Sequence, residues 1–230
     1  MTRQNLLLLH GALGSSAQFA PLLPLLHQKY EIHTLDFEGH GSAPLAARPF
    51  RIEHFVENTL AYLKQHDLES VDIFGYSMGG YVACTLALSH PDLVSSIATL
   101  GTKFYWDEET ARRETAFLDT EKIKAKVPHF AQALEARHTA AGWETVVNQT
   151  ADLLWSLAPT GGLRAKDVAP LQQRVRIMVG DRDSTVSIEE CAEMYRAIPQ
   201  GELEVLPGTR HELEKLSLDR LGYSLLDFFN

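Results

Sequence analysis

Ser77 stands between two glycines, in the spacing Gly75-x-Ser77-x-Gly79 that is typical of a nucleophile elbow. The apolar run at residues 71–74 predicts a buried strand before it, and the helical pattern at residues 78–90 predicts a helix after it. On such a turn the serine sits in strained backbone, and bulk two residues away on either side would collide, so both places are glycine. Free N–H groups at the start of the helix point to the same spot, where an oxyanion would be stabilised. The pattern favours a nucleophilic serine over an incidental serine in a Gly-rich turn.

A serine nucleophile needs a base that accepts its proton and an acid that orients the base. After an elbow of this kind the acid comes next in the chain and the histidine comes last. His211 follows the last predicted strand, in a loop that can reach the carboxyl edge of the sheet. His90 ends the elbow helix and points away, and the remaining candidates, His129 and His138, fall in helical patterns. We therefore predict that His211 is the base.

Two aspartates compete for the role of the acid, because both follow the fifth predicted strand. The spacing Gly180-x-x-Asp183 is the frequent arrangement and favours Asp183. Asp181 follows the strand so closely that we expect it to stabilise the turn instead.

An oxyanion hole needs two N–H donors. The residue after the nucleophile, Met78, supplies one, and the loop at residues 10–14 supplies the other, from Ala12 or alternatively from Leu13. No Lys-Ser/Thr follows this loop, which excludes a P-loop, and no Gly-x-Gly-x-x-Gly follows a strand. The histidines lack the spacing of metal ligands. We expect neither a metal nor a cofactor.

The chain as a whole has the composition of a globular protein. Its 230 residues are 45% hydrophobic and 22% charged, which fits one α/β domain with an insertion. With a net charge of −9 and no basic block, nucleic acid and an anionic membrane surface are not expected partners. No apolar run approaches a membrane span, and the two cysteines, Cys84 and Cys191, form no disulfide framework, so we expect a cytoplasmic protein.

Strands and helices are predicted to alternate along most of the chain. The predicted strands cover residues 5–9, 31–35, 71–74, 94–100, 174–179 and 202–206, and helical patterns cover residues 19–26, 52–66, 78–90, 188–198 and 216–229. This order predicts an α/β fold, with a mostly parallel sheet of about six strands covered by helices.

The segment between the fourth and fifth strands has a different character. Residues 103–166 contain no convincing strand, and their helical patterns lie at residues 108–118, 120–126, 129–138 and 143–155. We expect a helical cap at residues 103–166, inserted into a core formed by residues 1–102 and 167–230. It would emerge at the carboxyl ends of the strands, where open α/β sheets bind their ligands.

Five motifs in this order carry a resemblance to a known family. They are His10-Gly11-Ala12-Leu13-Gly14, Asp36-x-x-Gly39-His40-Gly41-Ser42, Gly75-Tyr76-Ser77-Met78-Gly79-Gly80, Gly180-x-x-Asp183 and His211. The sequence resembles the α/β-hydrolase superfamily, and within it the small capped esterase-like members and the lyase of menaquinone synthesis. Few residues precede the first motif, so the resemblance implies a sheet that lacks the family's first two strands. Glu38 stands where many relatives have arginine.

The helical insertion is rich in aromatic residues. We expect some of them to line an apolar substrate pocket, with Trp106, Phe130, Trp143, Trp155 and the nearby His138 as candidates. For each aromatic residue taken by itself, packing of the insertion onto the core is the favoured explanation. Together they indicate a small-molecule substrate with an apolar acyl or alcohol part.

These observations lead to one principal hypothesis, a serine hydrolase that cleaves small carboxylic esters or thioesters through an acyl-enzyme. The same Ser-Asp-His order also fits a lyase that uses the triad for elimination or C–C cleavage. It fits a non-turnover ligand-binding protein as well.

Overall fold

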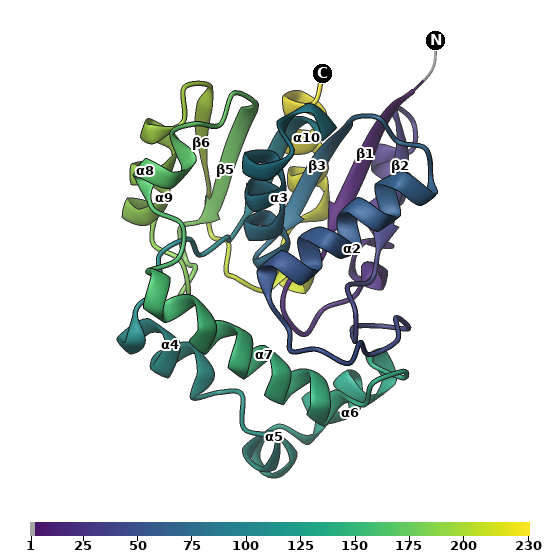
Figure 1. The fold of residues 1–230 in the computed structure, drawn as a ribbon, viewed down its shortest axis with the longest axis vertical. Helices are drawn as coiled ribbons and strands as arrows, with labels where there is room; N and C mark the ends of the chain where they lie inside the picture. Colours follow the sequence, from purple (N-terminus) through teal and green to yellow (C-terminus); the bar gives the residue numbers. More distant parts are fainter. Residues whose placement is uncertain (1–2) are drawn as a thin grey trace.

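Six parallel strands between two layers of helices form the body of the protein (Figure 1). The computed structural model describes residues 3–230. In spatial order the strands are β2 (Tyr30–Leu35), β1 (Gln4–Leu9), β3 (Val71–Tyr76), β4 (Val94–Leu100), β5 (Arg174–Gly180) and β6 (Gly201–Leu206). Every neighbouring pair is parallel, which confirms the predicted fold class. In such a sheet all carboxyl ends meet at one edge, so the loops after β1, β3, β5 and β6 lie together.

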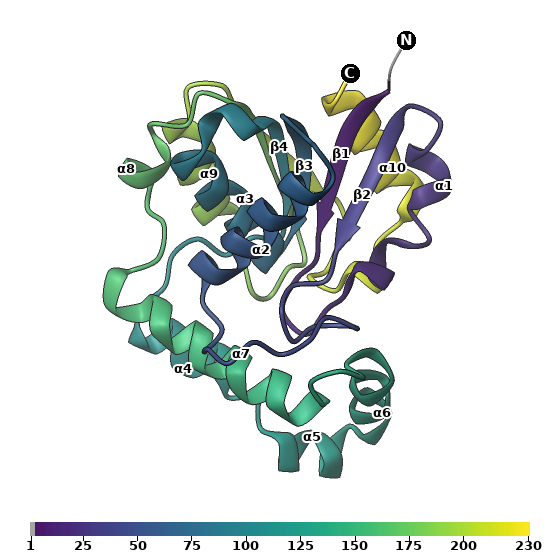
Figure 2. The same cartoon turned by 45° about the vertical axis from the view of Figure 1, so that its right-hand side comes forward.

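Helices cover both faces of the sheet, and each face has its own apolar core. On one face lie α2 (Ile52–Gln65), α3 (Met78–Ser89) and α9 (Ile188–Ala197), and on the other lie α1 (Leu23–Leu26) and α10 (Leu218–Phe228) (Figure 2). Because both faces are covered, the central strands read as continuous apolar runs, and Leu6–Leu9 are all fully buried. No helix in the described part of the chain combines the length and the apolar character that crossing a membrane requires.

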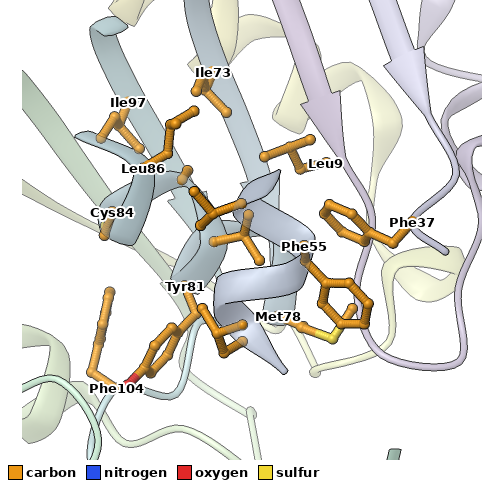
Figure 3. Packing of buried hydrophobic residues seen from close by; sticks show 14 of the residues in the cluster. Leu9, Phe37, Phe55, Ile73, Met78, Tyr81, Cys84, Leu86, Ile97 and Phe104 are labelled. Atoms are coloured by element: carbon orange, nitrogen blue, oxygen red, sulfur yellow. The ribbon is translucent and has the colours of Figure 1, made fainter. Parts of the chain in front are cut away.

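Helix α3, which begins directly after Ser77, is the most deeply packed helix. Most of its residues are apolar and buried, because the sheet and α2 pack against it, and only its end at Ser89 is exposed. Figure 3 shows its side chains packed against the strands and against aromatic residues of α2 and of neighbouring loops: Met78, Tyr81, Cys84 and Leu86 of α3 lie near Leu9, Ile73, Ile97, Phe37, Phe55 and Phe104. This packing holds the helix N-terminus at the carboxyl edge of the sheet.

The helical insertion (residues 103–166) lies across that same edge (Figures 1 and 2). It contains α4 (Glu108–Thr115), α5 (Thr120–Lys126), α6 (Pro128–Arg137), α7 (Trp143–Leu157) and the short helix η3 (Ala158–Thr160). The chain leaves and returns side by side, because Tyr105 and Gly162 form an antiparallel bridge. The N-termini of α4 and α5 are capped by Asp107 and Asp119, which accept backbone N–H bonds at 2.7 and 3.0 Å.

The structure differs from the predicted elements in two places. The predicted helix at residues 19–26 is split into the 3₁₀ turn η1 (Ser16–Phe19) and the four-residue α1, in which Pro24 occupies the first turn. Proline is tolerated there but not farther into a helix, so these residues cannot form one continuous helix. A short helix, α8 (Ala165–Val168), packs against α9 and already begins before the expected end of the insertion at Lys166.

The close approach of α3 to β1 can be tested at Gly79. A Cβ atom on Gly79 would lie 2.1 Å from the carbonyl oxygen of Leu9, a main-chain atom of the central sheet that cannot move aside. We expect Gly79→Ala to lower the free energy of unfolding by about 3 kcal/mol, measured by urea denaturation. The control is Gly208→Ala, where no atom lies within 4 Å and only the backbone angle φ of +66° opposes a side chain, at a cost of about 1 kcal/mol. Equal losses in the two variants would contradict this account.

Candidate active site

The backbone of Ser77 adopts a conformation that L-residues rarely occupy. With φ +51° and ψ −117°, it turns the chain from β3 directly into α3. Two hydrogen bonds hold this conformation: the Ser77 N–H donates to the Leu100 carbonyl at 2.8 Å, and the Thr102 hydroxyl donates to the Ser77 carbonyl at 3.0 Å. A Cβ on Gly75 would lie 2.4 Å from the backbone of Gly80, so the turn can close only around glycine.

The loops after β5 and β6 bring His211 and Asp183 to this serine. The Ser77 Oγ lies 3.3 Å from Nε2 of His211, and Nδ1 of His211 lies 2.8 Å from Oδ2 of Asp183. In this geometry the Nδ1–H group donates to the carboxylate, and Nε2 is left free to accept the serine hydroxyl proton. The Tyr76 hydroxyl donates to the His211 carbonyl at 3.0 Å and so ties the histidine loop to the elbow.

Asp183 is held as an anion in a buried position. Burial would raise the pKa of this carboxyl group, but the bond from His211 and the N–H groups of Thr185 and Val186, at 2.8 and 2.9 Å, outweigh it, and its pKa lies below the ordinary value. The second aspartate, Asp181, instead accepts the Thr209 N–H at 3.3 Å. It stabilises the turn and does not contact the histidine.

Gly101, which is not among the predicted site residues, borders the histidine and the aspartate. It follows β4 with φ +60°, and a Cβ on it would lie 3.2 Å from both the Asp183 carboxylate and the His211 ring. A side chain here would press on both groups. The sequence feature that could have revealed it is its place directly after a predicted strand, as the elbow also directly follows a strand.

A tight turn after β1 approaches the serine from the other side. The Gly14 N–H donates to the Gly11 carbonyl at 3.0 Å, and between them Leu13 has φ +56°. A Cβ on Gly11 would lie 3.2 Å from that of Ser77, which shows how closely the turn approaches. Within residues 3–230, the N–H groups of Ala12, Leu13 and Met78 donate to no protein acceptor, and all three residues line the cavity that contains Ser77.

The loop after β2 is fastened to its surroundings by two carboxylates. Asp36 accepts the backbone N–H groups of Ser16 at 2.7 Å and Ser42 at 3.0 Å, and so joins this loop to the one after β1. Glu38 accepts from Arg48 at 2.6 and 2.9 Å and also bonds Asn58 of α2. Glu38 is therefore an anchor for its loop and lies away from Ser77.

The cavity beside Ser77 and His211 measures about 260 Å³. Its walls are mainly apolar and come from the insertion and from α2 and α3: Ile52, Tyr81, Trp106, Phe117, Leu118, Leu153, Leu154 and Leu157. The cationic side chain at its border, Lys103, is paired with Glu190 at 3.1 Å. Such a cavity suits an apolar group of modest size, because it is slightly smaller than the pockets that bind drug-sized ligands.

Of the five residues expected to line a pocket, only Trp106 borders this cavity. Phe130 and Trp155 are 42% and 40% exposed to solvent, and Trp143 is buried. His138 instead contacts the turn after β1, where its Nε2 lies 3.0 Å from the Leu13 carbonyl. Leucines of α7 take the place of the expected aromatic residues, because helical spacing groups residues on one face but does not show which face meets the cavity.

Three buried histidines lie side by side behind the turn after β1. The rings of His10 and His138 are 5.1 and 5.6 Å from that of His40, and all three side chains are at most 1% exposed. Burial lowers the pKa of His10 and of His138 to about 4 and also lowers that of His40, so the three rings are neutral near pH 7. Among residues 3–230, no group of His, Cys, Asp or Glu is placed to hold a metal ion.

These histidines make the fold sensitive to acid. Their pKa values are lower in the folded chain than the usual 6.5, so below pH 6.5 the unfolded chain binds more protons and stability falls. For a folded pKa of about 4, the loss by pH 5 is on the order of 2 kcal/mol for each group. Urea denaturation at pH 7.5 and 5.0 measures it. The His138→Gln variant has one titrating group fewer and should lose less free energy of unfolding. Equal free energies of unfolding of the parent at the two pH values would contradict the lowered pKa values of these histidines.

Comparison with known proteins relates the chain to one family. A family model described as the alpha/beta hydrolase fold matches residues 4–142, more than half of the chain. A pimeloyl-[acyl-carrier protein] methyl ester esterase of Aeromonas hydrophila is 35% identical over 97 residues, which cover 42% of this chain and 37% of that enzyme. The mouse serine hydrolase BPHL is 25% identical over 97% of this chain and 78% of its own length.

Solved structures agree with the family model on the fold. A meta-cleavage product hydrolase from Pseudomonas fluorescens superimposes with a TM-score of 0.80 at 19% identity, covering 100% of this chain and 91% of that one. Among the curated relatives matched first, the shared segment is only about a third of the relative's own length, as with the 33% covered of a probable alcohol acetyltransferase from Cyberlindnera fabianii.

Proposed function

The chain belongs to the α/β-hydrolase family, and on that premise we propose that it is a serine hydrolase of small carboxylic esters or thioesters. The observation that carries this proposal is the arrangement of Ser77, His211 and Asp183, at 3.3 and 2.8 Å, beside unpaired N–H groups of Ala12 and Met78. A nucleophile, a base, an acid and oxyanion donors around one apolar cavity are the components of acyl transfer. Two of the related proteins carry names of hydrolases, which supports the reaction class.

In the first half of the proposed reaction, the Ser77 oxygen attacks the acyl carbon while Nε2 of His211 takes the hydroxyl proton. The carbonyl oxygen becomes an oxyanion, which the N–H groups of Met78 and Ala12 stabilise, with Leu13 as the alternative to Ala12. Asp183 keeps the imidazole in the required tautomer and stabilises its protonated form. The tetrahedral intermediate then expels the alcohol or thiol, which takes its proton from His211, and an acyl-enzyme remains.

In the second half, water attacks the acyl-enzyme. His211 accepts a proton from the water, a second oxyanion forms at the same N–H groups, and the bond from the acyl carbon to the Ser77 oxygen breaks. The serine recovers its proton from His211, and the carboxylic acid leaves. Because the aspartate remains ionised throughout, its low pKa suits this role.

The cavity supports a substrate with a short or medium apolar chain. Leu118, Leu153, Leu154 and Leu157 offer no charge and few hydrogen bonds, so binding there relies on apolar contact. The Lys and Glu residues that line the cavity, Lys103 and Glu114, are paired with Glu190 at 3.1 Å and with Arg113 at 3.0 Å. We propose that the acyl or alcohol part of a small ester occupies this space.

Replacement of the nucleophile tests the reaction class. We expect Ser77→Ala to lower kcat for p-nitrophenyl butyrate by about 10⁴-fold or more, because attack and acyl-enzyme formation are lost, while the circular dichroism spectrum and melting temperature stay close to those of the parent. A fluorophosphonate should label the parent and not the variant. Ser89→Ala, at the exposed end of the same helix, is the matched control and should keep full activity. Undiminished turnover in a clean Ser77→Ala preparation would exclude this mechanism.

Filling the cavity tests where the substrate binds. Leu154→Trp adds bulk to the wall formed by α7, so we expect kcat/KM for p-nitrophenyl octanoate to fall about tenfold or more, with the acetate little affected. Asp152→Trp adds the same side chain at an exposed position of α7 and should leave the chain-length profile unchanged. Equal losses of kcat/KM for the acetate and the octanoate in Leu154→Trp would show that the acyl chain of the substrate binds elsewhere.

A further inference from the structure

The carbonyl group of Leu13 is held by two side chains from the end of α6. Arg137 donates to it from Nη1 at 2.7 Å, and His138 lies 3.0 Å away through Nε2. We propose that Arg137 and His138 are positioning residues. They hold the turn at residues 11–14 so that the free N–H group of Ala12, or alternatively that of Leu13, points at the oxyanion formed on Ser77. This inference rests on the proposed hydrolase function and adds to it a dependence of the oxyanion hole on the helical insertion.

The turn needs such support because of the conformation of Leu13. Its φ of +56° lies in the left-handed region, where an L-side chain is strained, and the third position of a turn of this shape is ordinarily glycine or asparagine. A relaxed Leu13 would rotate the peptide that joins it to Ala12, which carries the Leu13 N–H group, and would open the turn that places the Ala12 N–H group beside Ser77. One internal bond, from Gly14 to Gly11, closes the turn. The two bonds to the Leu13 carbonyl fix the peptide that follows.

The hydrogen bonds around His138 define which nitrogen donates. The Gly41 N–H points at Nδ1 at 3.0 Å, so Nδ1 is the acceptor and Nε2 carries the hydrogen that is donated to Leu13. The ring is 1% exposed and neutral near pH 7, because burial lowers its pKa to about 4. The guanidinium of Arg137 also approaches Glu214, at 3.8 Å, in the segment that follows His211. The end of α6 thus contacts the loops after β1, β2 and β6.

A consequence follows for the reaction. The supporting side chains come from the helical insertion, whereas the turn and Ser77 belong to the sheet edge, so the oxyanion donor is correctly placed only while α6 is seated on the loops below it. Removal of an oxyanion donor lowers kcat by about 10²- to 10³-fold in a serine hydrolase. Displacing a donor that is still present should have a smaller effect, about 10- to 100-fold, on kcat rather than on KM.

Two amide substitutions at position 138 separate positioning from simple stability. His138→Gln carries an amide N–H group near the place of Nε2 and can still donate to the Leu13 carbonyl. His138→Asn carries an amide oxygen near the place of Nδ1 and can still accept from Gly41. Each variant keeps one of the two bonds, so a purely structural role predicts equal losses. Positioning predicts that kcat for p-nitrophenyl butyrate falls about 10- to 100-fold in His138→Asn and stays within about threefold in His138→Gln, with KM little changed in both.

The second variant pair addresses the other donor. Arg137→Met keeps the apolar stem and removes the bond to Leu13, so we expect a loss of kcat of similar size, whereas Arg137→Lys, which can still donate, should recover part of it. A trifluoromethyl ketone, whose adduct with the serine carries an oxyanion, should bind more weakly in proportion to each loss in kcat/KM. Affinity for the alcohol that has the same carbon skeleton as this ketone, which cannot form an adduct with the serine, should be unchanged.

The position of the turn can also be read without turnover. The ¹H–¹⁵N resonances of Ala12 and Leu13 should shift in His138→Asn and stay near the parent positions in His138→Gln. Equal kinetics in these two variants, or unmoved resonances in His138→Asn, would overturn the positioning role even in an active enzyme. If the parent hydrolyses no activated ester and takes no fluorophosphonate, the proposed hydrolase function fails, and the resonances still decide whether His138 and Arg137 hold the turn.

Discussion

The site depends on the close approach of three backbone segments, the ends of β1 and β3 and the start of α3, at one edge of the parallel sheet. The start of α3 lies so near β1 that no side chain fits on Gly79, and the elbow can close only without side chains at its flanking positions. This contact forces Ser77 into a conformation with φ +51°, which would relax in a free peptide. The strained conformation persists because the apolar packing around α3 and the hydrogen bonds of Ser77 with Leu100 and Thr102 hold the turn in place. Rigidity at this edge is thus the condition for a serine hydroxyl that stands clear of the sheet.

The remaining groups gather there for a topological reason. Parallel strands end at the same edge, so the loops after β5 and β6 deliver Asp183 and His211 to the loop after β3, although more than a hundred residues separate Ser77 from either. Burial alone would favour a protonated carboxyl group, and the hydrogen bond from His211 together with the N–H groups at the turn after β5 prevents this by lowering the pKa of Asp183. An anion that is fixed in place and shielded from water orients the histidine more firmly than an exposed carboxylate would.

The sequence was sufficient for the order and type of most elements, because periodicity and glycine spacing are local properties. The alternation of strands and helices predicted the parallel sheet, which the structure confirms, and the motifs indicated the family to which the chain belongs. The lining of the cavity was not predictable in the same way. Trp155 and Leu154 are adjacent in one helix, and only the packing of α7 decides that the leucine faces the cavity while the tryptophan faces outward. The contact between Leu13 and His138 spans 125 positions and has no local pattern.

The contact between His138 and Leu13 gives the insertion a second role in the proposed reaction, in addition to lining the cavity. A segment that only covered a cavity would influence which substrates enter and how tightly they bind. Here the end of α6 also contacts the backbone of the turn beside Ser77, through a neutral histidine that donates to one loop and accepts from another. The buried ring cannot become charged at neutral pH without losing its acceptor role toward Gly41, so its low pKa preserves both bonds. In the proposed mechanism, the cavity wall at α7 and the support of the oxyanion turn at α6 belong to one segment, in which the two helices pack against each other, so a movement that opens the cavity would also disturb the turn that carries the proposed donor.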